Sequence, residues 1–123
     1  MHDAQPIRVV FVEDDDDVRA GSSQALELAG LAVDSFASAE EARSRIHAGV
    51  PAVVLSDVKL PGISGAAWMN EIRAIDAELP VILVTGHGDI AMAVDAMRQG
   101  AYDFIEKPFP SKHLVAVVRR AAE

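Results

Sequence analysis

A carboxylate at position 57 stands between an apolar run and a sharp turn. The run reads Pro51-Ala-Val-Val-Leu-Ser56, and the turn after Asp57 reads Lys59-Leu-Pro-Gly62. Such a run is typical of a buried parallel strand, and the side chain at its carboxyl end lies at the rim of the sheet, where open α/β folds bind ligands. Asp57 is therefore positioned to act as a nucleophile, since carboxylates can form acyl phosphates.

Polar side chains follow three other apolar runs: Glu13 and Asp14 follow the first, Thr85 a later one, and Lys107 the last. Clustered carboxylates repel one another unless a cation neutralises them, and oxygen ligands without His or Cys favour Mg²⁺ or a similar hard ion. Lys107 adds a fixed positive charge, and Thr85 adds a hydroxyl donor. This set suits a phosphoryl group on Asp57, because its oxygens can be shared among metal, ammonium, hydroxyl and backbone N–H groups.

Each of these residues has a plainer interpretation when it is taken alone. The acidic run Glu13–Asp17 is typical of a solvated helix start, where acids complement the helix dipole. Asp57 before Pro-Gly is also typical of a turn, and Thr85 and Lys107 fit loop positions. The functional interpretation is favoured because all of them follow strand-like runs, and independent turn residues are not expected to share one edge of a sheet.

Two ring-bearing residues lie near these groups in the sequence. Phe104 belongs to the last apolar run, where alternation predicts that it faces opposite to Ile105, and a partly buried aromatic is an equally good interpretation. His87 is interpreted as a loop residue near the cleft rather than as a metal ligand, because no second histidine shares its neighbourhood.

Strand-like runs alternate with stretches of helical period, which predicts an α/β domain with a parallel sheet and right-handed crossovers. The strand-like runs are Ile7–Val12, Ala32–Phe36, Ala52–Ser56, Val81–Thr85 and Asp103–Ile105. In such a sheet all carboxyl ends of the strands share one edge, so the polar residues named above are expected to converge on one cleft.

Helical patterns fill the segments between these runs and after the last one. The first ends at Gly30, and the second begins with a Ser38/Glu41 capping box and ends at Gly49. The later three are expected to bury, in order, Trp68 or Met69 with Ile72 and Ile75; then Ile90, Val94 and Met97; and finally, after a Ser111 cap, Leu114, Val117, Val118 and Ala121.

Composition limits the possible functions. The 123 residues fit one domain, and half of them are apolar. A formal charge of −8 argues against a nucleic-acid surface, which needs clustered Lys and Arg. No apolar run approaches the roughly 20 residues of a membrane span. The first eight residues contain no apolar signal-peptide core and the chain has no cysteine, so the expected compartment is the cytoplasm.

The assembled residues resemble those of bacterial response-regulator receiver domains of the CheY-like fold, over essentially the whole chain. The resemblance is carried by Val12-Glu-Asp-Asp15, Leu55-Ser-Asp-Val-Lys-Leu-Pro-Gly62, Val84-Thr-Gly-His-Gly-Asp89 and Gly100-Ala-Tyr-Asp-Phe-Ile-Glu-Lys-Pro-Phe109. The last two stretches resemble receivers of the NtrC and DctD type, which regulate an attached ATPase acting on sigma-54 polymerase. The resemblance implies a three-layer (βα)5 fold, with a five-stranded parallel sheet of order 2-1-3-4-5 and helices on both faces. It also implies that residues 1–123 form a single receiver domain, either stand-alone or the N-terminal part of a longer regulator.

By this resemblance Asp57 accepts a phosphoryl group from the phosphohistidine of a sensor histidine kinase. Mg²⁺ is expected to be held by Asp14 directly, by Glu13 directly or through water, by Asp57, and by the backbone carbonyl of Lys59. The family usually has aspartate where this chain has Glu13, and the acidic run also permits a register shifted by one residue. The side chains of Lys59 and His87 are expected to border the phosphoryl group and to set its lifetime.

The resemblance assigns the switch to other residues. Lys107 is expected to pair with Asp57 before phosphorylation and with the phosphoryl oxygens afterwards, and the Lys107–Pro108 peptide bond is expected to be cis. Thr85 is expected to move toward the phosphoryl group while Phe104 changes its packing. The surface that responds is the fourth helix, fifth strand and fifth helix, whose candidates for contacts in a homodimer or with an output domain are Ile90, Met92, Ala96 and Ala121.

The resemblance implies a signalling domain rather than an enzyme, although the domain is expected to accelerate its own phosphorylation and dephosphorylation. The implied output is a sigma-54-type ATPase with a DNA-binding domain, attached or separate, while this domain itself binds neither nucleic acid nor membrane.

Three rival hypotheses fit less well. A magnesium-dependent phosphatase usually needs a second aspartate at the position of Lys59, and a flavodoxin-like nucleotide binder needs a phosphate loop where this chain has five acids. A receiver-like module that acts by protein contact alone remains an alternative, but it would not need the full set Asp14, Asp57, Thr85 and Lys107.

Overall fold

A computed structural model describes residues 6–86 and 88–123 of the chain. Five parallel strands form one sheet in the order β2-β1-β3-β4-β5. This confirms the predicted sheet and its order. The strands are β1 (Arg8–Val12), β2 (Ala32–Phe36), β3 (Ala52–Asp57), β4 (Val81–Thr85) and β5 (Asp103–Glu106).

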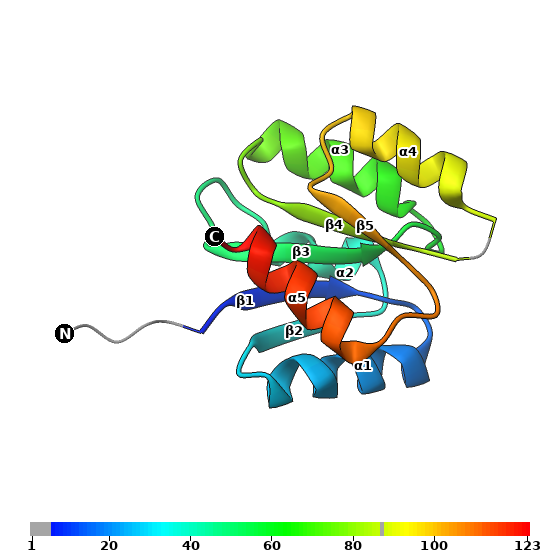
Figure 1. Cartoon of the computed structure of the whole chain (residues 1–123). Helices are drawn as coiled ribbons and strands as arrows, with labels where there is room; N and C mark the ends of the chain where they lie inside the picture. The colour runs from blue at the N-terminus through cyan, green and yellow to red at the C-terminus, as the bar shows by residue number, and fades with distance from the viewer. Residues whose placement is uncertain (1–5, 87) are drawn as a thin grey trace.

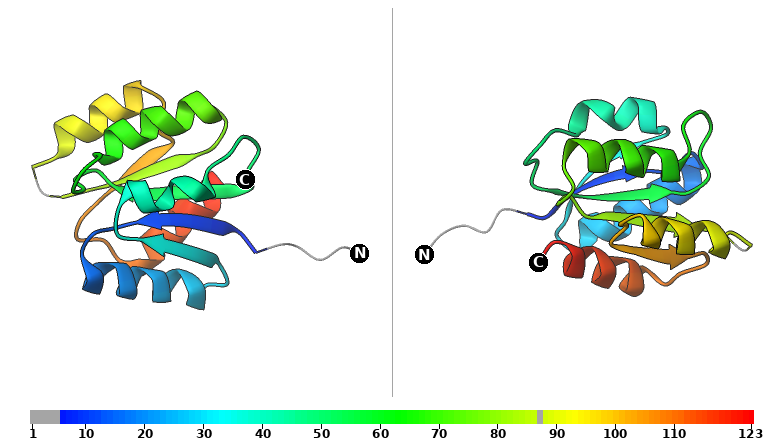
Figure 2. Two further views of the ribbon diagram at one scale, coloured as in Figure 1. Left: turned by 180° about the vertical axis from the view of Figure 1, so that it is seen from behind. Right: turned by 90° about the horizontal axis from the view of Figure 1, so that it is seen from above.

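Helices cover both faces of the sheet and complete three layers (Figure 1). They are α1 (Asp16–Leu28), α2 (Ala39–Ala42), the 3₁₀ turn η1 (Arg43–Arg45), α3 (Gly65–Ile75), α4 (Ile90–Arg98) and α5 (Ser111–Ala121). Figure 2 shows α1 and α5 on one face and α2 and α3 on the other. The predicted three-layer α/β fold is therefore confirmed. Within the described part of the chain no helix is long and apolar enough to cross a membrane.

Alternation along the strands divides the core into two apolar clusters. In β1, Val9 and Phe11 pack with Leu26 of α1 and with α5, whereas Val10 and Val12 pack toward α2 and α3. All six residues of β3 are buried, as a central strand covered on both faces requires. Each fully buried Val or Leu contributes about 1.5–3 kcal/mol, so the two clusters fix the strands whose ends carry the polar residues.

The second helix is much shorter than predicted. It ends at Ala42 rather than Gly49, and after η1 the chain is extended at Ile46, with φ −107° and ψ 122°. Ala42 and Ile46 are both buried. The extended backbone at Ile46 places its side chain in the core cluster that also holds Ile72 of α3, and at the surface Arg43 pairs with Glu71 of α3 at 2.8 and 2.9 Å.

The fourth helix turns a different face to the sheet from the one predicted. Ala93 and Ala96 are buried, whereas Ile90, Val94 and Met97 are 39%, 42% and 38% exposed. Small side chains let this helix lie close to the sheet, and its apolar residues go almost all round, so periodicity alone could not identify the inner face.

The third and fifth helices agree with the prediction in their cores and differ at one residue each. Trp68, Met69 and Ile72 are buried as expected, but Ile75 at the end of α3 is 44% exposed. The predicted apolar face of α5 is buried throughout. Ser111 lies inside α5 rather than capping it, because Pro110 occupies the N-cap position.

Candidate functional site

The polar residues predicted at the strand ends do converge on one edge of the sheet. Glu13 directly follows β1, Asp57 ends β3, Thr85 ends β4, and Lys107 directly follows β5. Three of these side chains are shielded from solvent, since Glu13 is 2%, Asp57 7% and Thr85 0% exposed. The parallel register of the strands explains how residues so far apart in the sequence reach one site.

Lys107 bridges the two buried carboxylates. Its Nζ lies 2.8 Å from Oδ2 of Asp57 and 3.1 Å from Oε1 of Glu13. Its backbone N–H donates to the carbonyl oxygen of Thr85 at 2.8 Å, which extends the pairing of β4 and β5 to the site. The Lys107–Pro108 peptide bond is cis, as the resemblance implies.

Burial and the bridge shift the pKa values of Glu13 and Lys107. Burial raises the pKa of Glu13 above its ordinary value of 4.5, while hydrogen bonds from Asp15 N–H and Lys107 act in the opposite direction and the charge of Asp57 adds to the rise. Burial lowers the pKa of Lys107, but its hydrogen bonds to Asp57 and Glu13 outweigh that effect and raise the pKa above 10.5. Lys107 is therefore a fixed cation at neutral pH.

Three carboxylates offer a site for a hard cation. Glu13, Asp14 and Asp57 each present an oxygen, and these oxygens lie within 4.8 Å of one another. Asp15 has a different task, because its carboxylate accepts the N–H groups of Asp17 and Val18 and caps α1, at 3.0 Å each. Within the acidic run it is therefore Glu13 and Asp14, rather than Asp14 and Asp15, that face Asp57. The all-oxygen donors of this cluster fit Mg²⁺.

Thr85 contributes a hydroxyl without a partner. Of the buried side-chain polar atoms in the described residues, only Ser23 Oγ and Thr85 Oγ1 make no hydrogen bond. A buried hydroxyl usually has a partner, so this group is available to a new acceptor at the site. Phe104 is half-buried and packs against the α2–α3 cluster, opposite to Ile105, which belongs to the α1–α5 cluster.

The loop after β3 is bound tightly to Asp57. The backbone N–H of Lys59 donates to Oδ1 of Asp57 at 3.1 Å, and Gly65 N–H donates to Val58 O at 2.8 Å. Gly65 leaves no room for a side chain, because a Cβ there would collide with the carbonyl oxygen of Asp57 and lie 2.9 Å from Val58 Cα. The loop is therefore held close to the reactive carboxylate.

Asp89 also borders the site, although the sequence analysis names it only as the last residue of the stretch Val84–Asp89. Its Oδ1 pairs with Nζ of Lys59 at 3.1 Å, and its Oδ2 accepts the N–H of Gly86 at 3.2 Å. Its place two residues after His87, in a stretch the resemblance already used, was the available signal. His87 itself lies outside the described residues.

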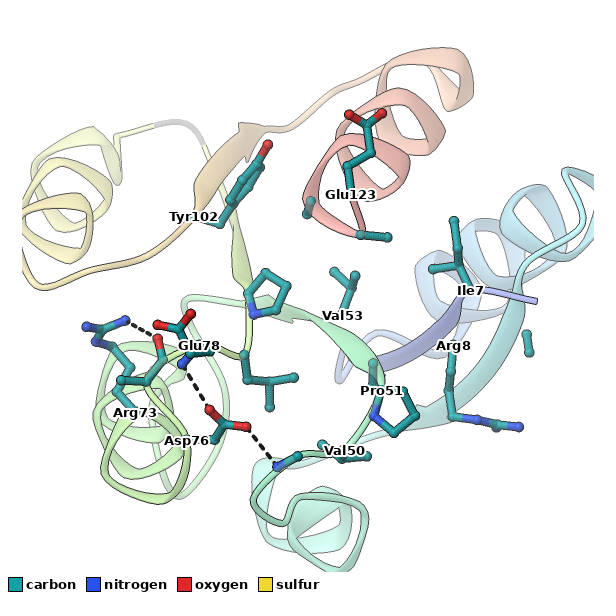
Figure 3. A pocket seen from close by; sticks show the side chains of 18 of the residues that line it. Ile7, Arg8, Val50, Pro51, Val53, Arg73, Asp76, Glu78, Tyr102 and Glu123 are labelled. Atoms are coloured by element: carbon teal, nitrogen blue, oxygen red, sulfur yellow. Dashed lines mark hydrogen bonds between the residues drawn. The ribbon is translucent and has the colours of Figure 1, made fainter. Parts of the chain in front are cut away.

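A hollow lies at the opposite edge of the sheet. It has a volume of about 820 Å³ and is lined by residues at the amino ends of the strands, among them Arg8, Pro51 and Tyr102. Figure 3 shows Asp76 within it, bonded to the loop before β3 and to its own turn. None of the predicted site residues lines this hollow, so it is separate from the acidic site.

A parallel sheet of this order, with carboxylates, hydroxyl and ammonium on its carboxyl edge, defines the receiver class of signalling domains. The chain belongs to the response regulator receiver domain family, whose pattern matches residues 9–119. It is the kind of domain found in two-component regulators of the NtrC and DctD type.

Individual relatives agree with this assignment. The chain is 52% identical over 115 residues to the C4-dicarboxylate transport transcriptional regulatory protein DctD of Rhizobium meliloti, covering 94% of this chain and 25% of that protein. It is 39% identical over 113 residues to the DNA-binding transcriptional regulator NtrC of Escherichia coli, covering 92% and 24%.

Among solved structures, the receiver domain of NtrX from Brucella abortus is similar with a TM-score of 0.84 and 37% identity, over 93% of this chain and 97% of that one. The chain thus spans about a quarter of the length of the DctD and NtrC relatives and nearly all of an isolated receiver domain.

Proposed function

We propose that residues 1–123 form a single receiver domain that accepts a phosphoryl group on Asp57 from the phosphohistidine of a sensor histidine kinase in the cytoplasm. One observation carries the proposal: Lys107 holds Asp57 and Glu13 together at the carboxyl edge of the sheet, at 2.8 and 3.1 Å. A carboxylate that pairs with a fixed cation is a suitable acceptor for an anionic phosphoryl group.

In the proposed transfer an oxygen of Asp57 forms a bond to phosphorus as the bond from phosphorus to the kinase imidazole nitrogen breaks, and the imidazole leaves. Mg²⁺ held by Glu13, Asp14, Asp57 and the Lys59 carbonyl would neutralise charge on the equatorial oxygens. The phosphoryl group adds about one to two negative charges. Lys107 is placed to move with them from the carboxylate to the phosphoryl oxygens, so positioning and charge supply most of the catalysis. The same site is expected to serve dephosphorylation, in which a water oxygen forms a bond to phosphorus as the bond from phosphorus to the Asp57 oxygen breaks and inorganic phosphate leaves.

The switch follows from the free hydroxyl of Thr85. Its buried Oγ1 has no hydrogen-bond partner among the described residues, so a hydrogen bond to a new phosphoryl oxygen would favour an inward position of the side chain. Phe104, which lies on the neighbouring strand β5 and is partly buried, is expected to repack. Phosphorylation then favours one conformation by the difference in these contacts, which needs only a few kcal/mol to exchange major and minor states.

The responding surface is α4, β5 and α5. Of the candidates for contacts with a partner, Ile90 and Met92 are 39% and 38% exposed. Ala96 and Ala121 are buried at 2% and 7%, so they are wrong as contact residues and belong to the core. Exposed Val94 and Met97 take their place beside Ile90 and Met92. We expect this surface to mediate homodimerisation or contact with an output domain.

The output and lifetime complete the proposal. Similarity to DctD and NtrC favours an output that activates sigma-54-dependent transcription, through an ATPase with its own DNA-binding domain. Lys59, and His87 outside the described residues, are expected to tune how long the phosphoryl group survives. The net charge of −8 fits a domain that leaves DNA binding to another part.

Intact-mass measurement tests the proposal. The protein incubated with Mg²⁺ and acetyl phosphate is expected to gain one phosphoryl group, and neither Asp57→Asn nor the metal-free wild type is expected to gain it. Asp16→Asn, which changes an exposed acid of α1, is the matched control and should be modified like the wild type. A chain that never gains the group would instead be a receiver-like module that acts by protein contact alone.

A further inference from the structure

A second ion pair lies beside the proposed phosphoryl site. Nζ of Lys59 is 3.1 Å from Oδ1 of Asp89, so the loop after β3 is tied to the start of α4. The Lys59 side chain is 70% exposed and that of Asp89 only 11%. The lysine can therefore change partner at little cost, whereas the shielded carboxylate needs a replacement if the lysine leaves.

Asp89 occupies the N-cap position of α4 but does not cap the helix. Its carboxylate bonds Lys59 and the N–H of Gly86 instead, and makes no bond to the first turn of α4. Its backbone has φ −101° and ψ 14°, outside the extended region that N-cap residues usually adopt. The side chain is thus turned away from the helix it could stabilise.

The other polar N-cap residues of the described helices behave differently. Asp15, Ser38 and Ser64 have ψ values of 116°, 158° and 158°, and each side chain accepts a hydrogen bond from its own first turn. Aspartate ranks among the best N-cap residues. Two arrangements are therefore open to Asp89: pairing with Lys59, as in this structure, or capping α4.

Lys59 also has a second partner if Asp57 is phosphorylated. Its backbone N–H already donates to Oδ1 of Asp57, so its side chain starts next to the acceptor carboxylate. A phosphoryl group brings three strong acceptor oxygens and up to about two negative charges, which makes it a better partner for an ammonium than one carboxylate oxygen.

We propose that phosphorylation draws Lys59 from Asp89 to the phosphoryl group, and that the released carboxylate of Asp89 then caps α4. Capping asks the backbone of Asp89 to turn into the extended region, so the first turn of the helix must shift. The exchange rests on the proposed function and gives it a route from Asp57 to α4 that does not pass through Thr85. Lys59 and Asp89 act here as positioning residues.

Amide NMR shifts of Ala91, Met92 and Ala93 test the exchange, with intact mass recorded on each sample. Wild type is expected to gain a phosphoryl group from acetyl phosphate and to shift these amides. Unmodified Lys59→Met frees Asp89, and unmodified Asp89→Asn keeps a capping oxygen without the charge that holds Lys59. In both variants the amide shifts are therefore expected to fall between those of unmodified and those of phosphorylated wild type, on the straight line that joins the two.

Two further variants sharpen the result. Asp89→Ala also breaks the ion pair but cannot cap, so its amides should not move along that line. Lys112→Met removes an exposed lysine of α5 and should leave the amides at the unmodified wild-type positions. If wild type gains no phosphoryl group, the proposed function fails.

If wild type is phosphorylated and its α4 amide signals shift, the variants test whether the Lys59–Asp89 exchange causes that shift. Amides of Lys59→Met and Asp89→Asn that stay at the unmodified positions would overturn the exchange alone. The exchange would also be overturned if the amide shifts of Asp89→Ala changed in the same way as those of Asp89→Asn.

Discussion

At the scale of single residues, the hydroxyl of Thr85 gives the unmodified site a free-energy cost that the proposed phosphorylation would relieve. The hydroxyl is fully buried at the end of β4 and has no hydrogen-bond partner among the described residues. Leaving such a group unsatisfied costs about 1–3 kcal/mol, a cost that a new acceptor at the site would relieve. The unmodified domain therefore carries a small instability that the proposed phosphorylated state removes.

Thr85→Val tests this account through stability. The change keeps the shape of the side chain and removes the unsatisfied hydroxyl, so the free energy of unfolding of the unmodified domain is expected to stay unchanged or to rise by about 1 kcal/mol. Urea denaturation without Mg²⁺ or phosphodonor measures it. A loss of more than about 1 kcal/mol would mean that the hydroxyl already has a partner in the unmodified domain.

Lys107 occupies the space between the carboxylates that a metal ion would neutralise. Because its Nζ contacts both Asp57 and Glu13, it competes electrostatically with any cation at the site. Lys107→Met is therefore expected to tighten Mg²⁺ binding by about 10-fold, as measured by calorimetric titration. Lys112→Met serves as the control with unchanged affinity. Equal or weaker binding by Lys107→Met would contradict the bridging role.

Sequence reasoning located most site residues and missed one relationship. Strand-end placement found Glu13, Asp57, Thr85 and Lys107, because parallel strands bring their carboxyl ends together whatever the loops do. The pairing of Lys59 with Asp89 was not predictable, since it depends on how two loops lie across the site. No local pattern encodes such a contact between loops.

At the scale of elements, the β3–α3 loop depends on Gly65. Its backbone is in the first turn of α3, and an added Cβ would meet the carbonyl oxygen of Asp57 and Val58 Cα, both rigid backbone atoms. Gly65→Ala is expected to lower the free energy of unfolding by about 2–4 kcal/mol and to displace Asp57. Thermal and urea denaturation measure the loss.

Gly21 supplies the matched control for Gly65. It lies within α1, is exposed, and has no atom within 4 Å of the position of an added Cβ. Gly21→Ala should therefore stabilise the domain by about 0.5–1 kcal/mol through helix propensity alone. Similar effects of the two substitutions would show that the close approach at Gly65 does not matter.

The carboxylate of Asp76 accepts hydrogen bonds from two loops at the amino edge of the sheet, the loop before β3 and the loop before β4. Hydrogen bonds from Gly49 N–H, at 2.9 Å, and from Glu78 N–H, at 3.0 Å, lower the pKa of Asp76 below its ordinary value of 3.8. The folded state thus favours the ionised form. The stabilisation is present above the unfolded pKa and is lost as pH falls through the lower pKa of the folded protein.

The stability advantage of wild type over Asp76→Asn is expected to be constant near neutral pH and to shrink as pH falls to 3.8 and below. Denaturant titrations of both proteins at pH 7 and pH 3 measure the difference. Asparagine keeps one acceptor oxygen, so the variant remains folded for the comparison. A difference that grows with acid would contradict the assignment.

Helix identity was predictable where one face was distinctly apolar. The pattern of α5 gave its buried residues correctly, because the opposite face carries Lys112, Arg119 and Arg120. In α4 large apolar residues lie on the outer face, and the inner face is made of Ala93 and Ala96. The segment after Ala42 has helix-compatible residues, but its chain is extended at Ile46, whose side chain is buried in the core, and no local pattern reveals that tertiary contact.

At the scale of the whole molecule, the two edges of the sheet have different characters. The carboxyl edge carries the acidic site, the Thr85 hydroxyl and the Lys59–Asp89 pair. The amino edge carries the hollow that Asp76 lines. The sheet order followed from the resemblance, and the shared edge followed from strand polarity alone. Family membership agrees with both.

The whole-molecule account predicts that one modification at the carboxyl edge changes the outer surface of α4. The exposed Ile90, Met92, Val94 and Met97 give that surface its apolar character. Sedimentation measured with and without acetyl phosphate is expected to show a change in self-association, and Met92→Lys is expected to abolish it by placing a charge on the surface. A change that persists in the variant would place the contact elsewhere.

The central claim is that Asp57 itself carries the phosphoryl group. Borohydride reduction of the protein treated with Mg²⁺ and acetyl phosphate converts an acyl phosphate of aspartate into homoserine, which peptide mass spectrometry can locate. The account predicts homoserine at position 57 and at no other acidic residue of the chain. Homoserine at Asp14 instead, or an unreduced Asp57 in protein that carries the phosphoryl mass, would contradict it.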